Sequence, residues 1–231
     1  MLKKILSAAV CTAVFSIALS AQNISSGNIF PEIWEGEKSL RTESDCTKAE
    51  GDFNNDGIKD IAVIATPKNP EFMRTRDDGY VYNFNKPVLA IFFGQKSGKL
   101  KLFSEYKNTI PGDDAENEDC FHETEMSVSS KGVLSISVSE FYSQGGSDAP
   151  KTEYVFRYQK GDFYLIGKNY GSFSRYSGDG EKVSENYLTR KKKTVSYNVF
   201  DESVPEKETW SKLPSAPLQR LGEKLLSVFE E

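Results

Sequence analysis

Three aspartates and two asparagines crowd the stretch from residue 51 to residue 64, G-D-F-N-N-D-G-I-K-D-I-A-V-I. Oxygen-bearing side chains recur at alternate positions on a short loop, and Gly57 permits a sharp bend between them. Calcium takes six to eight hard oxygen ligands, and a loop of this kind can turn several of them inward. We therefore predict a Ca²⁺ site with these ligands: Asp52, Asn54, Asp56, Asp60 and the main-chain carbonyl of Ile58.

The sequence after the loop separates this motif from other calcium motifs. An EF-hand needs a bidentate glutamate at loop position 12, where this chain has Val63, and the following segment is a β-branched run. The pattern D-x-N-x-D-G-x-x-D followed by a hydrophobic strand resembles the FG-GAP/VCBS repeat, the calcium loop of integrin-type β-propeller blades. The resemblance covers residues 50–102 and implies that the five ligands bind a structural calcium ion. The alternative is an Asx-rich turn that holds no metal.

Propellers repeat this motif once per blade, whereas the chain contains one copy. We therefore expect one blade-like unit inside an antiparallel meander or sandwich. In this respect the chain resembles small exported bacterial proteins that carry a single such motif.

Hydrophobic patterning predicts that the rest of the fold is mainly β. Residues 61–64 and 88–93 are continuous apolar runs, as in central strands that are covered on both faces, and residues 134–139 alternate strictly. Four hairpins are predicted in residues 92–100, 128–133, 156–163 and 187–195, where glycine or lysine-rich turns separate strand-like runs. The apolar residues of the last segment recur at spacings of three and four and predict a short amphipathic helix; they are Leu218, Leu221, Leu225 and Phe229.

The N-terminus has the pattern of a secretory signal peptide. Lys3 and Lys4 precede an apolar run that ends in small residues, and the run is too short to span a membrane. We predict a signal peptide over residues 1–21 and a single β-rich domain over residues 22–231. The mature protein is expected to be periplasmic or extracellular, without a membrane span. The basic residues of the chain are scattered, and over its full length 34 acidic residues outnumber 29 basic ones, so we expect no nucleic-acid partner.

Two cysteines, Cys46 and Cys120, would remain after removal of the signal peptide. An even pair in an exported protein is most simply one disulfide. This bond would close a loop of roughly 75 residues and stabilise the fold by about 4 kcal/mol through chain entropy. The alternative is two separate buried thiols.

The sequence contains one histidine, His122, and no G-x-S-x-G motif accompanies it. We therefore interpret His122 as a surface or packing residue and expect neither a catalytic triad nor a zinc site built on histidines. Two loops stand out, a polar one over residues 68–85 and an acidic one over residues 111–125. These features favour a monomeric, non-enzymatic binding or envelope-associated protein whose ligand is a protein or a glycan. The alternatives are a carboxylate-dependent glycan hydrolase and an inhibitor that presents the acidic loop to a secreted hydrolase.

Overall fold

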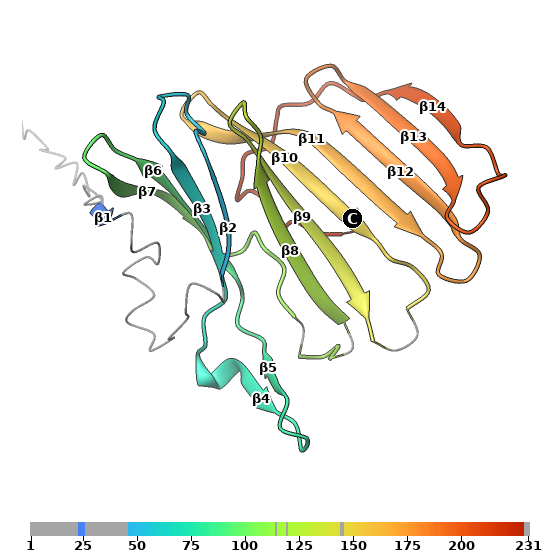
Figure 1. Cartoon of the computed structure of the whole chain (residues 1–231), viewed down its shortest axis with the longest axis horizontal. Coiled ribbons are helices and arrows are strands. Elements are labelled where there is room, and N and C mark those ends of the chain that lie inside the picture. Colours follow the sequence, from blue (N-terminus) through green and yellow to red (C-terminus); the bar gives the residue numbers. More distant parts are fainter. Residues whose placement is uncertain (1–22, 26–45, 114, 119, 144–145, 229–231) are drawn as a thin grey trace, which may run out of the picture.

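The computed structural model describes residues 23–25, 46–113, 115–118, 120–143 and 146–228, which form mainly antiparallel β-sheet (Figure 1). The fold class predicted from the sequence is confirmed at this level. The signal peptide predicted for residues 1–21 lies outside the described residues. No helix in the described part of the chain has the length and apolar character that a membrane crossing requires.

The smaller of the two main sheets has five strands in the order β1-β7-β6-β3-β2. They are β1 (Asn23–Ser25), β2 (Cys46–Gly51), β3 (Asp60–Ala65), β6 (Val88–Gly94) and β7 (Lys99–Tyr106). All six residues of β3 are buried, as are the first five of β6, because these central strands are covered on both faces. The two continuous apolar runs of the sequence are therefore the centre of this sheet.

The larger sheet is a seven-stranded meander in which each strand is hydrogen-bonded to the next along the chain. Its strands are β8 (Cys120–Val128), β9 (Val133–Tyr142), β10 (Lys151–Gln159), β11 (Asp162–Phe173), β12 (Asp179–Asn186), β13 (Lys191–Asn198) and β14 (Lys207–Lys212). The four predicted hairpins are confirmed as the β6–β7, β8–β9, β10–β11 and β12–β13 pairs. The acidic stretch 111–125 is shorter as a loop than predicted, because β8 already begins at Cys120.

One hydrophobic core joins the two sheets. Ile64 and Ile91 of the smaller sheet lie in the same buried cluster as Ile136 and Phe156 of the larger sheet. Burial of these side chains supplies the main stabilisation of the sheet pair. The aromatic residues of β10 thus serve packing, and Tyr154 and Phe156 are both buried.

The edges of the two sheets meet where β2 lies beside β8 (Figure 1). The Thr47 hydroxyl donates a hydrogen bond to the Thr124 carbonyl at 3.4 Å, and Gly51 contacts Val128 at the other end of the strands. The two strands therefore run in the same direction. A Cβ at position 51 would lie 2.3 Å from Val128 Cγ1, so only glycine permits this approach. We call this line of contact the seam.

The predicted C-terminal helix is wrong: residues 213–228 contain no helix, and Phe229 lies outside the described residues. The segment runs as an extended strap that buries Leu221, Leu226 and Val228, whereas Leu225 is 55% exposed. The backbone of the strap has one internal hydrogen bond, from the Glu223 amide to the Arg220 carbonyl, and is otherwise bonded mainly to other segments. At its end, the Thr152 hydroxyl donates to the Val228 carbonyl at 2.7 Å. Because an isolated helix of about 12 residues is marginal in water, these tertiary bonds override the helical spacing of the leucines.

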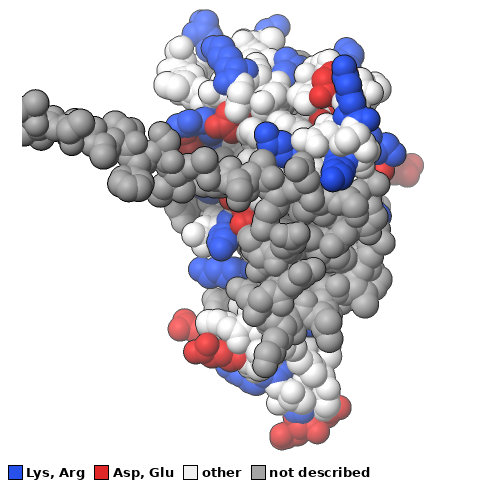
Figure 2. Space-filling view, turned by 90° about the vertical axis from the view of Figure 1, so that its left-hand side faces the viewer, with Lys and Arg blue, Asp and Glu red and all other residues white. Residues whose placement is uncertain are grey.

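The polar loop predicted for residues 68–85 contains a 3₁₀ turn (Pro70–Phe72) and a two-stranded hairpin, β4 (Met73–Thr75) and β5 (Val81–Asn83). The hairpin projects beyond both main sheets (Figure 1). On the face shown in Figure 2, acidic side chains gather at the end that carries this hairpin, and lysine and arginine side chains at the opposite end. Arg74 of the hairpin is ion-paired with Glu118, which removes one charge from the acidic stretch 111–125.

Candidate functional site

The aspartate loop connects β2 to β3 and is closed by its own hydrogen bonds. The Asp52 carboxylate accepts the amide N–H groups of Asp56 at 3.1 Å and Gly57 at 2.8 Å. The Asn54 side chain accepts from the Asp56 amide at 3.0 Å, and the Asp56 carboxylate accepts from the Ile58 amide at 2.8 Å. Gly57 has a φ of 80°, as the bend requires. The structure thus brings Asp52, Asn54 and Asp56 together at the exposed end of the loop.

Asp60, the fourth side-chain ligand of the prediction, is turned away from this exposed end and is fully buried. One carboxylate oxygen accepts the Phe53 amide at 2.8 Å, and the other accepts the Gly94 amide at 2.9 Å. Burial raises the pKa of the Asp60 carboxyl, the charges of Asp56 and Asp52 raise it further, and the two amide hydrogen bonds oppose the rise. Asp60 therefore ties the loop to the end of β6.

The loop offers the oxygen donors that calcium prefers. In the structure, however, these donors are not close enough together to share one ion. Ligand oxygens lie 2.3–2.6 Å from a calcium ion, so those that share an ion lie within about 5 Å of one another. Within the described residues, one set of three or more Asp, Glu, His and Cys side chains has donor atoms within 4.8 Å of one another, and the loop aspartates are not part of it. The carboxylates of Asp52, Asp56 and Asp60 would have to move to hold one ion.

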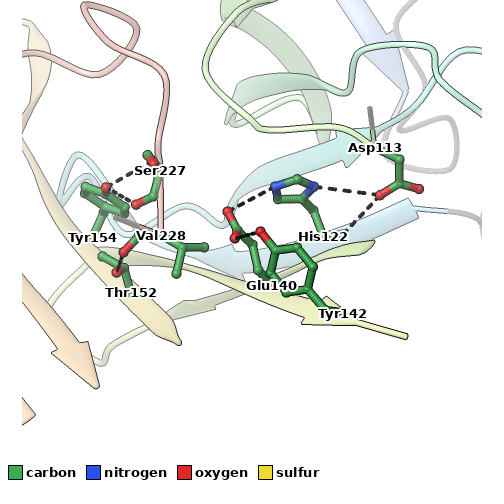
Figure 3. A network of polar contacts seen from close by, with 8 residues as sticks. All are labelled: Asp113, His122, Glu140, Tyr142, Thr152, Tyr154, Ser227 and Val228. Atoms are coloured by element: carbon green, nitrogen blue, oxygen red, sulfur yellow. Dashed lines mark hydrogen bonds and ion pairs between the residues drawn. The ribbon is translucent and has the colours of Figure 1, made fainter. Parts of the chain in front are cut away.

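The set that does converge consists of Cys120, His122 and Glu140, and it lies at the end of the β8–β9 ribbon. Figure 3 shows His122 and Glu140 with their neighbours Asp113 and Tyr142. Cys120 pairs with Tyr142 across the ribbon, and His122 pairs with Glu140. Side chains two residues apart on a strand share a face, so the ribbon presents these four residues together. They continue the inward-facing row of β9 past the buried Val138, where the core gives way to polar side chains.

Short contacts connect the members of this cluster. His122 Nε2 lies 3.3 Å from Glu140 Oε1, and the Tyr142 hydroxyl donates to Glu140 Oε2 at 3.3 Å. From the preceding loop, Asp113 Oδ1 accepts the His122 amide N–H at 3.0 Å and lies 3.8 Å from Nδ1 of the ring. The last distance is too long for a hydrogen bond, so Asp113 acts on the ring through its charge.

The neighbouring groups shift the ionisation of the cluster. Asp113 is the main cause of the raised pKa of His122; Glu140 adds to the rise and burial opposes it. The contact with Cys120 is the main cause that raises the pKa of Tyr142 to about 12, with burial and Glu140 adding to it. His122 is therefore not the isolated packing residue that the sequence suggested. The sequence carries one signal of its partners: the alternation over 134–139, extended by two further steps, reaches Glu140 and Tyr142.

The predicted disulfide is absent, because no bond joins Cys46 to Cys120 in the structure. Both cysteines begin strands at the seam, β2 and β8 respectively. Since Thr47 is level with Thr124, Cys46 is level with Glu123, and Cys120 lies three residues away along β8. Three strand residues span roughly 10 Å, beyond the Cα separation of about 7 Å that a disulfide tolerates.

A third feature is a cavity of about 630 Å³ at the ends of β11, β12 and β13. It is lined by the aromatic ring of Tyr170 and by the carboxylates of Asp148, Asp179 and Glu181. The register of β11, β12 and β13 directs the Tyr197 ring to the opposite face of the sheet, against Gly180 and Lys182. Hydrogen bonds, chiefly from Asn198 and then from Ser177, lower the pKa of the Asp179 carboxyl.

The cavity belongs to an open flank of the larger sheet, which we define as β12, β13 and β14. Of the residues in these three strands only Glu185 is buried, and Trp210 is 61% exposed. Figure 1 shows the open flank extending away from the smaller sheet, so neither face of it is covered by that sheet. Comparison of the chain with known protein families, with curated proteins and with solved structures finds no match.

Proposed function

We propose that the protein is an exported, non-enzymatic binding protein of the periplasm or the cell exterior, and that its ligand is a glycan held on the open flank. The observation that carries this proposal is the 630 Å³ cavity, which combines the aromatic ring of Tyr170 with polar side chains on an otherwise uncovered sheet. Sites for small ligands combine apolar surface with a few polar groups that fix orientation. Sugars present both apolar ring faces and hydroxyl groups, and so suit the Tyr170 ring beside the carboxylates.

The charge of the cavity narrows the class of glycan. Three carboxylates and one ammonium group, that of Lys207, line the cavity, so an acidic polysaccharide would be repelled. An uncharged or amino-bearing sugar chain fits this balance. Oligomers of N-acetylglucosamine and their deacetylated counterparts are therefore the appropriate probes.

Binding is measured by calorimetric titration of the protein with both probes. Tyr170→Ala removes the aromatic ring from the cavity, and since such a contact contributes about 0.5–1.5 kcal/mol, affinity should fall roughly two- to tenfold. Tyr176→Ala is the matched control, because Tyr176 is 78% exposed and does not line the cavity. The absence of binding to either probe, or equal losses in the two variants, would contradict the proposal.

The lowered pKa of Asp179 argues against this carboxyl as the general acid of a glycan hydrolase. A glycosidase needs one carboxylic acid that stays protonated near neutral pH to donate to the leaving group. The hydrogen bonds to Asp179 favour its ionised form instead. We expect no new reducing ends when the protein is incubated with the same oligomers; their release, and its loss in Asp179→Asn, would favour the enzyme.

The inhibitor alternative has less support, because several charges of the acidic stretch are already engaged. Glu118 pairs with Arg74, Glu125 with Lys151 at 2.6 Å, and Asp113 lies against His122. A stretch whose charges are satisfied internally attracts a basic enzyme less strongly.

We further propose that the aspartate loop binds a structural calcium ion, with residues 50–102 as an FG-GAP/VCBS-like unit. Two observations support this: three oxygen-bearing side chains meet at the exposed end of the loop, and β2, β3, β6 and β7 form an antiparallel meander around it. Millimolar Ca²⁺ should raise the melting temperature above that in EDTA, because an ion that binds the folded state stabilises it. Asp56→Ala should abolish the rise and Asp77→Ala, in another turn, should preserve it. A rise that survives Asp56→Ala would place the ion elsewhere.

A further inference from the structure

Three side chains that commonly ligate metals converge at the start of the β8–β9 ribbon, outside both the aspartate loop and the glycan cavity. The Cys120 thiol, the His122 imidazole and the Glu140 carboxylate each have a donor atom within 4.8 Å of the other two. Figure 3 shows His122 and Glu140 facing each other. Cys120 and His122 stand two residues apart on β8, and Glu140 faces His122 from β9. A paired ribbon holds such side chains at fixed spacing, so the arrangement does not depend on a mobile loop.

The spacing of the donors matches that around a tetrahedral metal ion. Zinc binds imidazole nitrogen at 2.0–2.1 Å and carboxylate oxygen at 2.0–2.2 Å, which puts two such ligands about 3.4 Å apart at tetrahedral angles. His122 Nε2 and Glu140 Oε1 are 3.3 Å apart. The Tyr142 hydroxyl holds the other oxygen of Glu140, and so keeps Oε1 directed at the ring.

Burial and charge also favour a cation at this place. Cys120 is 4% exposed, and the side chains of His122 and Glu140 are 14% and 11% exposed. A thiolate and a carboxylate bring two negative charges, which one divalent ion neutralises. The mixture of sulfur, nitrogen and oxygen donors suits zinc, whereas calcium and magnesium prefer oxygen alone.

The surroundings supply an outer partner for the histidine. Its Nδ1 is buried and makes no hydrogen bond to the described part of the chain, and the Asp113 carboxylate lies 3.8 Å away. Histidines that bind zinc through one nitrogen usually direct the other N–H at a carboxylate. His122 also lines a cavity of about 180 Å³ together with Asp113 and Thr124, which leaves room for water beside the cluster.

We propose that Cys120, His122 and Glu140 form a zinc site with Asp113 as the outer partner of the histidine and a fourth position open to water. The site is independent of the proposed glycan cavity and of the proposed calcium loop. The proposed site needs only one histidine, because a cysteine and a glutamate supply the other two ligands.

Cobalt(II) titration of the reduced, metal-free protein tests the site directly. Co²⁺ replaces zinc in tetrahedral sites and gives a thiolate-to-cobalt charge-transfer band when sulfur is a ligand. We expect one equivalent to produce this band, with displacement by Zn²⁺ and no effect of excess Ca²⁺. The absence of the band in the unaltered protein, or its loss on adding Ca²⁺, would overturn the proposal, whatever the variants do.

Variants then assign the ligands. Cys120→Ser should remove the charge-transfer band, whereas Cys46→Ser, the matched control at the start of β2 on the same seam, should keep it. Asp113→Asn should weaken zinc binding by roughly 10- to 100-fold while the band persists, as expected of an outer partner. Equal bands in the two cysteine variants, or full affinity in Asp113→Asn, would contradict the assignment.

Discussion

The role of Asp60 can be tested by removing its carboxylate in the absence of metal. Asp60 is fully buried and accepts the amides of Phe53 and Gly94 at 2.8 and 2.9 Å. Asp60→Ala leaves both amides without an acceptor, and each unsatisfied buried group costs about 1–3 kcal/mol. Relief of the buried charge offsets part of this loss. We expect the free energy of unfolding to fall by about 3 kcal/mol.

The measurement is urea or thermal unfolding with EDTA present throughout, so that bound calcium does not contribute. For a domain of this size, about 3 kcal/mol corresponds to a melting temperature roughly 6–12 °C lower. Asp56→Ala is the control from the same loop: its carboxylate is exposed and accepts the Ile58 amide, so the loss should stay below about 1 kcal/mol. If Asp60→Ala costs no more than Asp56→Ala, Asp60 is not a structural tie and the reasoning fails.

Two further predictions concern other parts of the fold. Burial raises the pKa of Glu105 above its ordinary value of 4.5, and nearby Lys107 opposes the rise. The folded state therefore holds this proton more tightly than the unfolded state, and stability should fall as pH rises from 4.5 through the folded pKa. The Glu105→Gln variant should lack this decline. If urea titrations show the same pH dependence of the free energy of unfolding in the variant and the unaltered protein, the prediction is contradicted. For the strap, Leu226→Ala should cost about 2–5 kcal/mol because Leu226 is buried. Leu225→Ala should lower the free energy of unfolding by less than about 0.5 kcal/mol because Leu225 is exposed. Comparable urea-unfolding midpoints for the two variants would indicate a different packing of the segment.

Local patterns predicted those parts of the fold that local physics determines. Period-two alternation identified β9, and continuous apolar runs identified β3 and β6, because burial on one or two faces leaves a direct imprint on the sequence. The leucine spacing at the C-terminus, by contrast, did not determine the secondary structure of that segment. The strap takes its hydrogen bonds from Thr152 and other distant residues, and no local pattern records them.

The candidate sites divide in the same way. The aspartate loop is contiguous, so its residues were found from spacing, although the burial of Asp60 depends on Gly94, 34 residues further on. The cluster around His122 needs the register of β8 against β9, which places Glu140 opposite His122. That register cannot be read from one histidine and one cysteine. The alignment of β2 with β8 separates Cys46 from Cys120, the two cysteines that composition alone suggested were bonded.

The positions of the two proposed ions follow from where the apolar core ends. The seam runs along β8 from Cys120 to Val128, and its middle is covered by core side chains such as Ile136. At one end lies the cysteine–histidine cluster. At the other end the aspartate loop meets the β8–β9 turn, where a Cβ on Gly132 would lie 2.1 Å from the Asp52 carbonyl. Polar side chains replace the core at both ends, and the two proposed ions would bind there. The two ends are separated by eight residues of strand, roughly 27 Å, and at that distance the two ions should stabilise the fold independently.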